Sequence, residues 1–165
     1  MNEKSAPGGG DAADPEAFRA AMAGINGART YVAGMCCGML DAALAAALAH
    51  GRERHAFGTA LLDHPAVAEK LAGAATTLAA MRALTREAAQ VIDAGGDAAL
   101  PAAIAKKFAG ENIVTALAAC MQAMGAAGLR EEVPIGRHIA LGRIANYVDG
   151  TTEMQTRLIA ATLRR

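Results

Sequence analysis

An apolar pattern with the period of an α-helix runs without a break from Pro65 to the glycine pair at positions 95 and 96. Its members recur at steps of three, four and seven residues: Val67, Leu71, Leu78, Met81, Ala88 and Ile92. Side chains at this spacing lie on one face of a helix. The pattern therefore predicts a long helix that turns one apolar stripe toward a core and ends at the glycines.

A second helical stretch precedes this one. Asp14 and Pro15 are typical of an N-cap followed by proline at the first helical position, and helical composition continues from there to His50. A break near residues 24–27, which include two glycines, is left open. The charged segment from Gly51 to Pro65 is expected to be a connection.

A third helix is expected to open at Pro101 and to end in the glycine-containing segment 125–128. Its apolar residues keep the helical period: Ile104, Phe108, Leu117, Met121 and Met124. Lys106, Lys107 and Glu111 fall between them, and we expect all three on the solvated side.

Two more helices are expected after Pro134. The shorter spans about residues 135–147, and the last runs from about Thr152 to the C-terminus, with Glu153 and Arg157 spaced as an i,i+4 pair. Helical segments joined by short connections are typical of a bundle. The expected fold is all-α, an antiparallel up-and-down four-helix bundle over residues 15–165, preceded by a disordered tail over residues 1–14.

The composition agrees with helices and argues against some partners. Hydrophobic residues make up 53% of the 165 residues but aromatic residues only 3%. The core must therefore be built from aliphatic residues and Met, among which Ala and Leu rank highest in helix propensity. Sixteen basic and sixteen acidic residues give a formal net charge of zero, so the sequence shows no basic patch of the kind that binds nucleic acid or anionic membranes.

The cysteines and histidines show no metal-binding pattern. Cys36 and Cys37 are adjacent and Cys120 is alone, which indicates reduced, buried thiols in a cytoplasmic protein. The four histidines, at positions 50, 55, 64 and 138, also lack ligand spacing. We expect no metal site.

The stretch from Tyr31 to Ala49 is apolar enough to compare with a membrane span, and Gly34 and Gly38 form a GxxxG pair within it. Asp41, in its middle, would cost on the order of 3 kcal/mol at a bilayer centre. We therefore expect a soluble bundle helix whose two glycines allow close helix packing. The polar N-terminal tail is not expected to be a secretory signal.

The segment from Tyr147 to Gln155 holds the strongest candidate for chemistry. It reads Tyr-Val-Asp-Gly-Thr-Thr-Glu-Met-Gln, so a carboxylate and a glycine precede a helix start. Backbone N–H groups at such a start are free to bind an anion or a polarised carbonyl. The structural alternative is an ordinary Asp-Gly turn followed by a capping box of Thr152 and Gln155.

This segment resembles the Tyr-Glu-Gly-Thr-Ser-Glu-Ile-Gln pattern of the acyl-CoA dehydrogenases, and other blocks of that family occur in the same order. Arg-Glu-Arg-His-Ala-Phe-Gly at residues 52–58 resembles Arg-x-x-Phe-Gly. Gln-Ala-Met-Gly-Ala-Ala-Gly at residues 122–128 resembles Gln-x-x-Gly-Gly-x-Gly. The resemblance covers about residues 18–165 and indicates the C-terminal all-helical domain of the family.

The resemblance implies a catalytic role for Asp149, at the position of the carboxylate that removes the α-proton of an acyl-CoA thioester. It also implies that Gly150 and Arg29 bind the substrate, with the backbone beside Gly150 holding the thioester carbonyl. Ala28 precedes Arg29, so no carboxylate fills the alternative position of the base in some relatives. Asp149 is one methylene shorter than the family's glutamate.

The resemblance further implies FAD as the cofactor. Six residues match the family's FAD contacts: Arg54, Phe57, Gln122, Gly125, Thr151 and Glu153. Arg54 and Phe57 correspond to positions that reach the FAD of a neighbouring subunit, with the arginine on the pyrophosphate. The structural alternatives are a solvated charge for Arg54, a core position for Phe57 and a helix C-cap for Gly125.

The family's complete fold also has an N-terminal helical domain and a middle β-domain, which residues 1–14 are too few to supply. We therefore expect a module that oxidises acyl-CoA together with a partner chain carrying those domains, and that forms homo-oligomers. The alternative is a non-catalytic helical module for oligomerisation or regulation.

Overall fold

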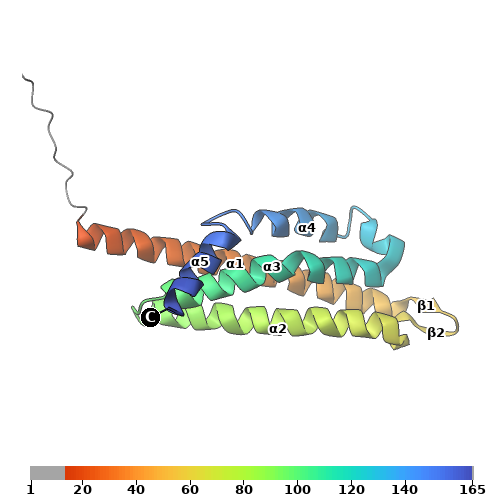
Figure 1. The fold of residues 1–165 in the computed structure, drawn as a ribbon. Helices are drawn as coiled ribbons and strands as arrows, with labels where there is room; N and C mark the ends of the chain where they lie inside the picture. Colours follow the sequence, from red (N-terminus) through yellow and green to blue (C-terminus); the bar gives the residue numbers. More distant parts are fainter. Residues whose placement is uncertain (1–13, 165) are drawn as a thin grey trace, which may run out of the picture.

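Five α-helices make up most of the chain in the computed structural model, which describes residues 14–164 (Figure 1). The long helices are α1 (Pro15–Glu53), α2 (Pro65–Asp93) and α3 (Ala99–Met124), and the short ones are α4 (Ile135–Ile144) and α5 (Thr152–Thr162). Figure 1 shows the long helices side by side with alternating direction. The all-α class is confirmed. In place of a single fourth long helix, the two short helices α4 and α5 both pack on α3.

The start of α1 follows the sequence prediction. The Asp14 side chain accepts a hydrogen bond from the Glu16 backbone N–H at 3.0 Å, and Pro15 occupies the first turn. The helix then continues without a break to Glu53. Each glycine within it costs about 1 kcal/mol relative to alanine, but burial of Asn26 and Arg29 on the same turns holds the helix together.

A small hairpin, absent from the prediction, connects α1 to α2. Its strands β1 (His55–Ala56) and β2 (Thr59–Ala60) are antiparallel, and a 3-10 turn η1 (Leu61–Asp63) follows. The two loop residues, Phe57 and Gly58, both have positive φ, at 51° and 86°, as two-residue hairpin loops of type I′ require. The His64 ring supports the loop, with Nε2 at 3.0 Å from the Ala56 carbonyl oxygen.

The remaining boundaries differ from the prediction by a few residues. Helix α3 begins two residues before Pro101, and a 3-10 segment η2 (Gly125–Leu129) follows its end. Helix α4 ends at Ile144, three residues before the expected end. Residues 1–13, most of the predicted tail, lie outside the described residues.

Helix α3 lies at the centre of the bundle and packs against α1, α2, α4 and α5. Most of its buried residues are small: Ala102, Ala103, Ala105, Ala109, Gly110, Ala116 and Ala123. Small side chains allow close helix approach. At Gly110 a Cβ atom would lie only 2.7 Å from the Asn146 side-chain oxygen, so the segment after α4 rests directly on the α3 backbone.

The three cysteines are buried free thiols, as predicted. Cys36 and Cys120 are fully buried, in α1 and α3. Burial raises the pKa of each of these two thiols to about 11. Both therefore remain protonated at neutral pH and serve as small apolar packing groups.

The GxxxG prediction holds for only one of its glycines. Gly34 faces the Thr85 side chain of α2 at 3.9 Å, but Gly38 is exposed and has no neighbouring atom within 4 Å of its Cβ position. The predicted packing role of Gly38 is therefore wrong within the described chain. Asp41, near the middle of α1, pairs with Arg82 of α2 at 2.9 Å.

Two segments, Pro15–Glu53 and Ala99–Leu129, are long and apolar enough to span a membrane by length and composition alone. The core helices of a soluble protein meet the same criterion. The expectation of a soluble bundle therefore stays a prediction.

Candidate functional site

The turn between α4 and α5, which we call the Asp149 turn (residues 145–151), has an unusual backbone. Asp149 is exposed and has a φ of 51°, and Gly150 follows with a φ of 91°. Aspartate is among the few side chains that tolerate the left-handed region. At Gly150 a Cβ atom would lie 2.9 Å from the Gln155 amide nitrogen and 3.6 Å from the Arg29 guanidinium. Only glycine fits there.

Three buried donors hold the two carbonyls of this turn from beneath. Arg29 Nε donates to the Asp149 carbonyl at 3.3 Å. The Gly150 carbonyl accepts two hydrogen bonds, from Lys106 Nζ at 2.6 Å and from Gln155 Nε2 at 3.0 Å. The three residues are 8%, 1% and 0% exposed, respectively. Side chains from α1, α3 and α5 therefore converge on the backbone of this turn.

This arrangement decides where the N–H groups point. No peptide bond in the described chain is cis, and in a trans peptide the N–H points away from the preceding carbonyl. With the Asp149 and Gly150 carbonyls held inward, the N–H groups of Gly150 and Thr151 face away from the buried donors. Neither donates a hydrogen bond to any other atom of residues 14–164. The Asp149 N–H has no backbone acceptor there either. The turn thus offers a carboxylate and unused N–H donors, a combination that can remove a proton and stabilise an oxyanion.

Two cations lie beneath the exposed carboxylate. Burial lowers the pKa of Lys106, while the nearby charge of Asp149 raises it. The pKa of Arg29 is lowered by burial and raised by Asp149 in the same way. The Asp149 carboxylate therefore lies in the field of two buried positive charges.

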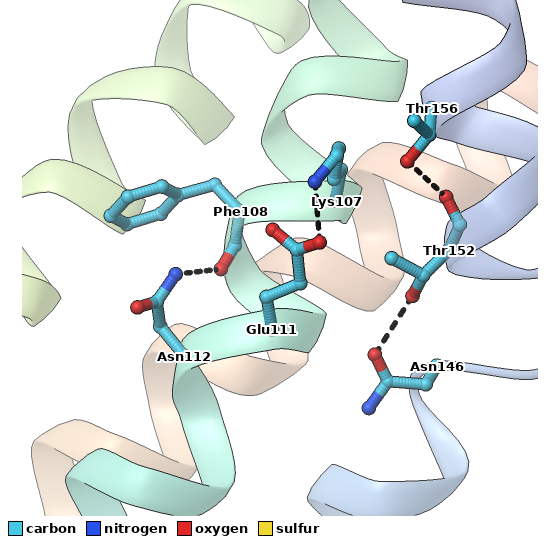
Figure 2. Close-up of polar contacts among 7 residues, drawn as sticks. All are labelled: Lys107, Phe108, Glu111, Asn112, Asn146, Thr152 and Thr156. Atoms are coloured by element: carbon cyan, nitrogen blue, oxygen red, sulfur yellow. Dashed lines mark hydrogen bonds and ion pairs between the residues drawn. The ribbon is translucent and has the colours of Figure 1, made fainter.

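The start of α5 fixes the far side of the turn. The Thr152 hydroxyl donates to the Asn146 side-chain oxygen at 2.8 Å (Figure 2). Thr151, not Thr152, is the N-cap and accepts from the Met154 N–H at 3.4 Å. The capping box of Thr152 and Gln155 is therefore wrong, because the Gln155 side chain bonds to Gly150 instead.

Thr151 and Glu153, both predicted FAD contacts, lie at this helix start. The pKa of Glu153 is lowered, chiefly by its own backbone N–H and next by the Thr151 hydroxyl. An exposed carboxylate at a helix N-terminus is favoured by the free N–H groups there. Thr151 and Glu153 therefore belong to the same cluster as Asp149.

Lys106 lies on the opposite side of α3 from the one that the sequence predicted. Its expected position on the solvated side is wrong, because it is 1% exposed. Lys107 and Glu111 do form an ion pair on the outer side of α3 (Figure 2). A signal was available in the sequence: the residues three and four positions from Lys106 on either side are small, namely Ala102, Ala103, Ala109 and Gly110. A lysine within a stripe of small residues faces a neighbouring helix.

A second cluster of predicted residues lies at the other end of α1. Arg54, Gln122 and Gly125 line one hollow of about 500 Å³, which we call the Arg54 hollow. Arg54 makes no salt bridge within residues 14–164. Gly125, with a φ of 58°, is also the C-cap of α3, as its structural alternative predicted.

Phe57 lies on the neighbouring hairpin and is 100% exposed. The core position offered as its alternative is therefore wrong. A fully exposed phenylalanine at positive φ has no packing role within the described chain beyond an edge contact with His64. It is therefore available to a ligand or another polypeptide.

The two clusters are well separated. Arg29 lies within α1 and Arg54 is the C-cap of the same continuous helix. Their separation of 25 residues corresponds to about 38 Å at a rise of 1.5 Å per residue. The predicted site residues therefore form two groups, one at the Asp149 turn and one around the Arg54 hollow.

The arrangement of these segments agrees with the comparisons with known proteins. The family described as acyl-CoA dehydrogenase, C-terminal domain, matches residues 17–164. The chain belongs to this family. The matched range includes both the Asp149 turn and the residues of the Arg54 hollow.

Short-chain enzymes are among its relatives. The short-chain specific acyl-CoA dehydrogenase of Megasphaera elsdenii is 32% identical over 148 residues, which cover 90% of this chain and 39% of that protein. The mitochondrial short-chain specific enzyme of Bos taurus is 34% identical and covers 88% and 35%, respectively. The solved structure of butyryl-CoA dehydrogenase from M. elsdenii has a TM-score of 0.85 and 31% identity, covering 92% of this chain and 40% of that one. The domain spans about two fifths of the length of these relatives.

Proposed function

We propose that this domain is the C-terminal module of an FAD-dependent acyl-CoA dehydrogenase in which Asp149 is the catalytic base. The observation that carries the proposal is the Asp149 turn, with its exposed carboxylate beside unused backbone N–H groups. Removal of a proton next to a thioester carbonyl requires a positioned base and a means to stabilise the developing oxyanion. Butyryl-CoA, after the relative of that name, is the first substrate to test.

Each residue of the turn has a distinct part in this proposal. Asp149 takes the α-proton, and the unused backbone N–H groups beside its carboxylate stabilise the thioester oxygen. Arg29, predicted as a substrate-binding residue, donates to the Asp149 carbonyl, and this contact supports a role in holding the base rather than in touching the substrate.

The Arg54 hollow fits part of an FAD molecule. Arg54, with no salt bridge in the described chain, suits a pyrophosphate. Gln122 supplies an amide, and the exposed Phe57 ring supplies an apolar surface. When bound, FAD accepts the hydride from the β-carbon of the substrate.

The distance between the two clusters supports a shared cofactor site. About 38 Å is more than the diameter of a small domain, so the Arg54 hollow and the Asp149 turn of one chain serve different FAD molecules. Each FAD is then shared between Thr151 and Glu153 of one copy and Arg54, Phe57, Gln122 and Gly125 of another. A homo-oligomer follows from this arrangement.

An apolar face beside the Asp149 turn supports a further partner. Its exposed residues come from α1, α4 and the turn: Tyr31, Met35, Leu141, Ile144, Tyr147 and Val148. Met35, Leu141 and Val148 also line a groove of about 510 Å³. Contiguous exposed apolar surface marks an interaction site. We propose that a partner chain with the family's other domains covers this face and excludes water from Asp149.

The flavin content of the purified complex tests the proposal. We would co-express this chain with a chain that carries a helical domain and a β-domain of the family. The two should form a yellow complex with a flavin absorbance maximum at about 450 nm. Arg54→Gln should lower the flavin content, whereas Arg52→Gln, an equal change of charge outside the hollow, should not. A colourless chain that self-associates with or without the second chain would instead favour the non-catalytic module.

A further inference from the structure

Lys106 is a buried ammonium group with no anionic partner in contact. Its Nζ lies within hydrogen-bond distance of the Gly150 carbonyl, and no carboxylate of residues 14–164 is within 4.0 Å of it. Burial of a charge without a paired opposite charge is unfavourable. Methionine, of similar length, would fill the same space among the small residues of α3 without that cost. The cation therefore calls for an explanation other than core packing.

The contact that Lys106 makes is specific to the candidate active site. The Gly150 carbonyl receives donors from two helices, Lys106 of α3 and Gln155 of α5. The Gln155 amide is held on one side only, because its Oε1 is buried with no partner in the described chain. Lysine can only donate, so Lys106 makes this carbonyl an acceptor that points inward.

We infer that Lys106 is a positioning residue that orients the Gly150–Thr151 peptide, so that the Gly150 carbonyl points inward and the Thr151 N–H faces away from the buried donors. Its effect on catalysis rests on the proposed function, whereas its effect on the geometry of the turn does not. Without the ammonium, the peptide has only the half-held Gln155 to keep it in place. The N–H would then lose the fixed orientation that makes an oxyanion donor effective.

The order of the turn can be measured on the 165-residue chain without substrate. We expect ¹⁵N order parameters for Gly150 and Thr151 of about 0.85 in the unchanged protein, and below about 0.6 in Lys106→Met. Lys107→Met, which removes the adjacent lysine that pairs with Glu111, is the matched control and should leave both values unchanged. Equal order parameters in Lys106→Met and the unchanged chain would overturn the inference.

A second pair of variants tests the same role through the other donor of the Gly150 carbonyl. Gln155→Met leaves the Gly150 carbonyl with its lysine donor, so the turn should keep most of its order. The double variant removes both donors and should lose more order than the two single changes together, since they act on one carbonyl. A turn that is equally ordered after Gln155→Met and after the double change contradicts the role of Lys106.

Turnover separates this inference from the proposed function. In the yellow complex, Lys106→Met should lower kcat by about 10- to 100-fold, with the flavin content retained and KM changed by less than about twofold. Unchanged kcat in an otherwise active complex would overturn the positioning role. If the complex never oxidises acyl-CoA, the proposed function fails, and the order parameters still decide whether Lys106 holds the turn.

Discussion

The buried ammonium of Lys106 links the stability of the domain to pH. Burial lowers the pKa of Lys106 below the ordinary value of 10.5, against the opposing effects of Asp149, Cys36 and Glu153 and with the help of Arg29. Between the lowered pKa and the ordinary one, the unfolded chain binds more protons than the folded chain. The contribution of Lys106 to the free energy of unfolding therefore rises with pH across that window and is lowest below it.

Lys106→Met removes this dependence and provides a prediction. At about pH 7 the variant should be at least as stable as the unchanged protein, because an apolar replacement avoids the cost of burying a charge and Gln155 still donates to the Gly150 carbonyl. Its advantage should shrink toward about pH 10. Urea unfolding of both proteins at the two pH values measures the difference in their free energy of unfolding and its change with pH. A loss of about 3–5 kcal/mol at neutral pH, as expected from breaking a buried ion pair, would show that the lysine stabilises the core.

At the residue scale, the sequence indicated the turn but not the groups that hold it. Asp149 and Gly150 stand out because the segment around them resembles the family's Tyr-Glu-Gly-Thr pattern, whereas an Asp-Gly pair alone is typical of an ordinary turn. Lys106 does not, because lysine on a helix is usually solvated and the face that is buried depends on where α4 and α5 pack. The roles of Arg54 and Phe57 at FAD stay predictions: Arg54 lines the hollow, and Phe57 is exposed on the hairpin that follows α1.

Two glycines in different helices test how closely the elements pack. In α3, Gly110→Ala would place its Cβ 2.7 Å from the Asn146 side-chain oxygen, which already accepts a hydrogen bond from Thr152. Moving Asn146 disturbs the connection to α5, so we expect a loss of about 1–3 kcal/mol in the free energy of unfolding. In α1, Gly38→Ala meets no neighbouring atom and should gain about 0.5–1 kcal/mol.

Thermal unfolding of the two variants checks this pair. The same substitution in two helix interiors controls for helix propensity, so the difference between them reports the contact with Asn146. Equal effects on Tm would contradict the close packing of the segment after α4 on α3.

At the element scale, the helices could be predicted because their apolar residues repeat over many turns. The hairpin could not, since strands of two residues carry no period. The suspected break at residues 24–27 rested on glycine propensity alone, and packing around Asn26 and Arg29 overrides it. The division between α4 and α5 was predicted from the Asp-Gly pair, and two successive residues with positive φ form it.

At the scale of the whole molecule, the domain displays parts of a site rather than a closed one. The Asp149 carboxylate is exposed, the Arg54 hollow lies at the other end of α1, and an apolar face extends from α1 to the turn. These features agree with a domain that spans about two fifths of its relatives. Assembly with other subunits is what would bring a base, a cofactor and a substrate together.

We propose that the Asp149 carboxylate removes the substrate proton. Asn tolerates the left-handed backbone at least as well as Asp, so Asp149→Asn removes the charge while keeping the turn. The measurement is dye reduction by butyryl-CoA in the purified yellow complex, with flavin absorbance recorded on the same sample. We predict that Asp149→Asn retains the flavin and loses at least about 1,000-fold in turnover, which is within the range that general-base catalysis supplies. Turnover equal to that of the unchanged complex would show that Asp149 is not the base.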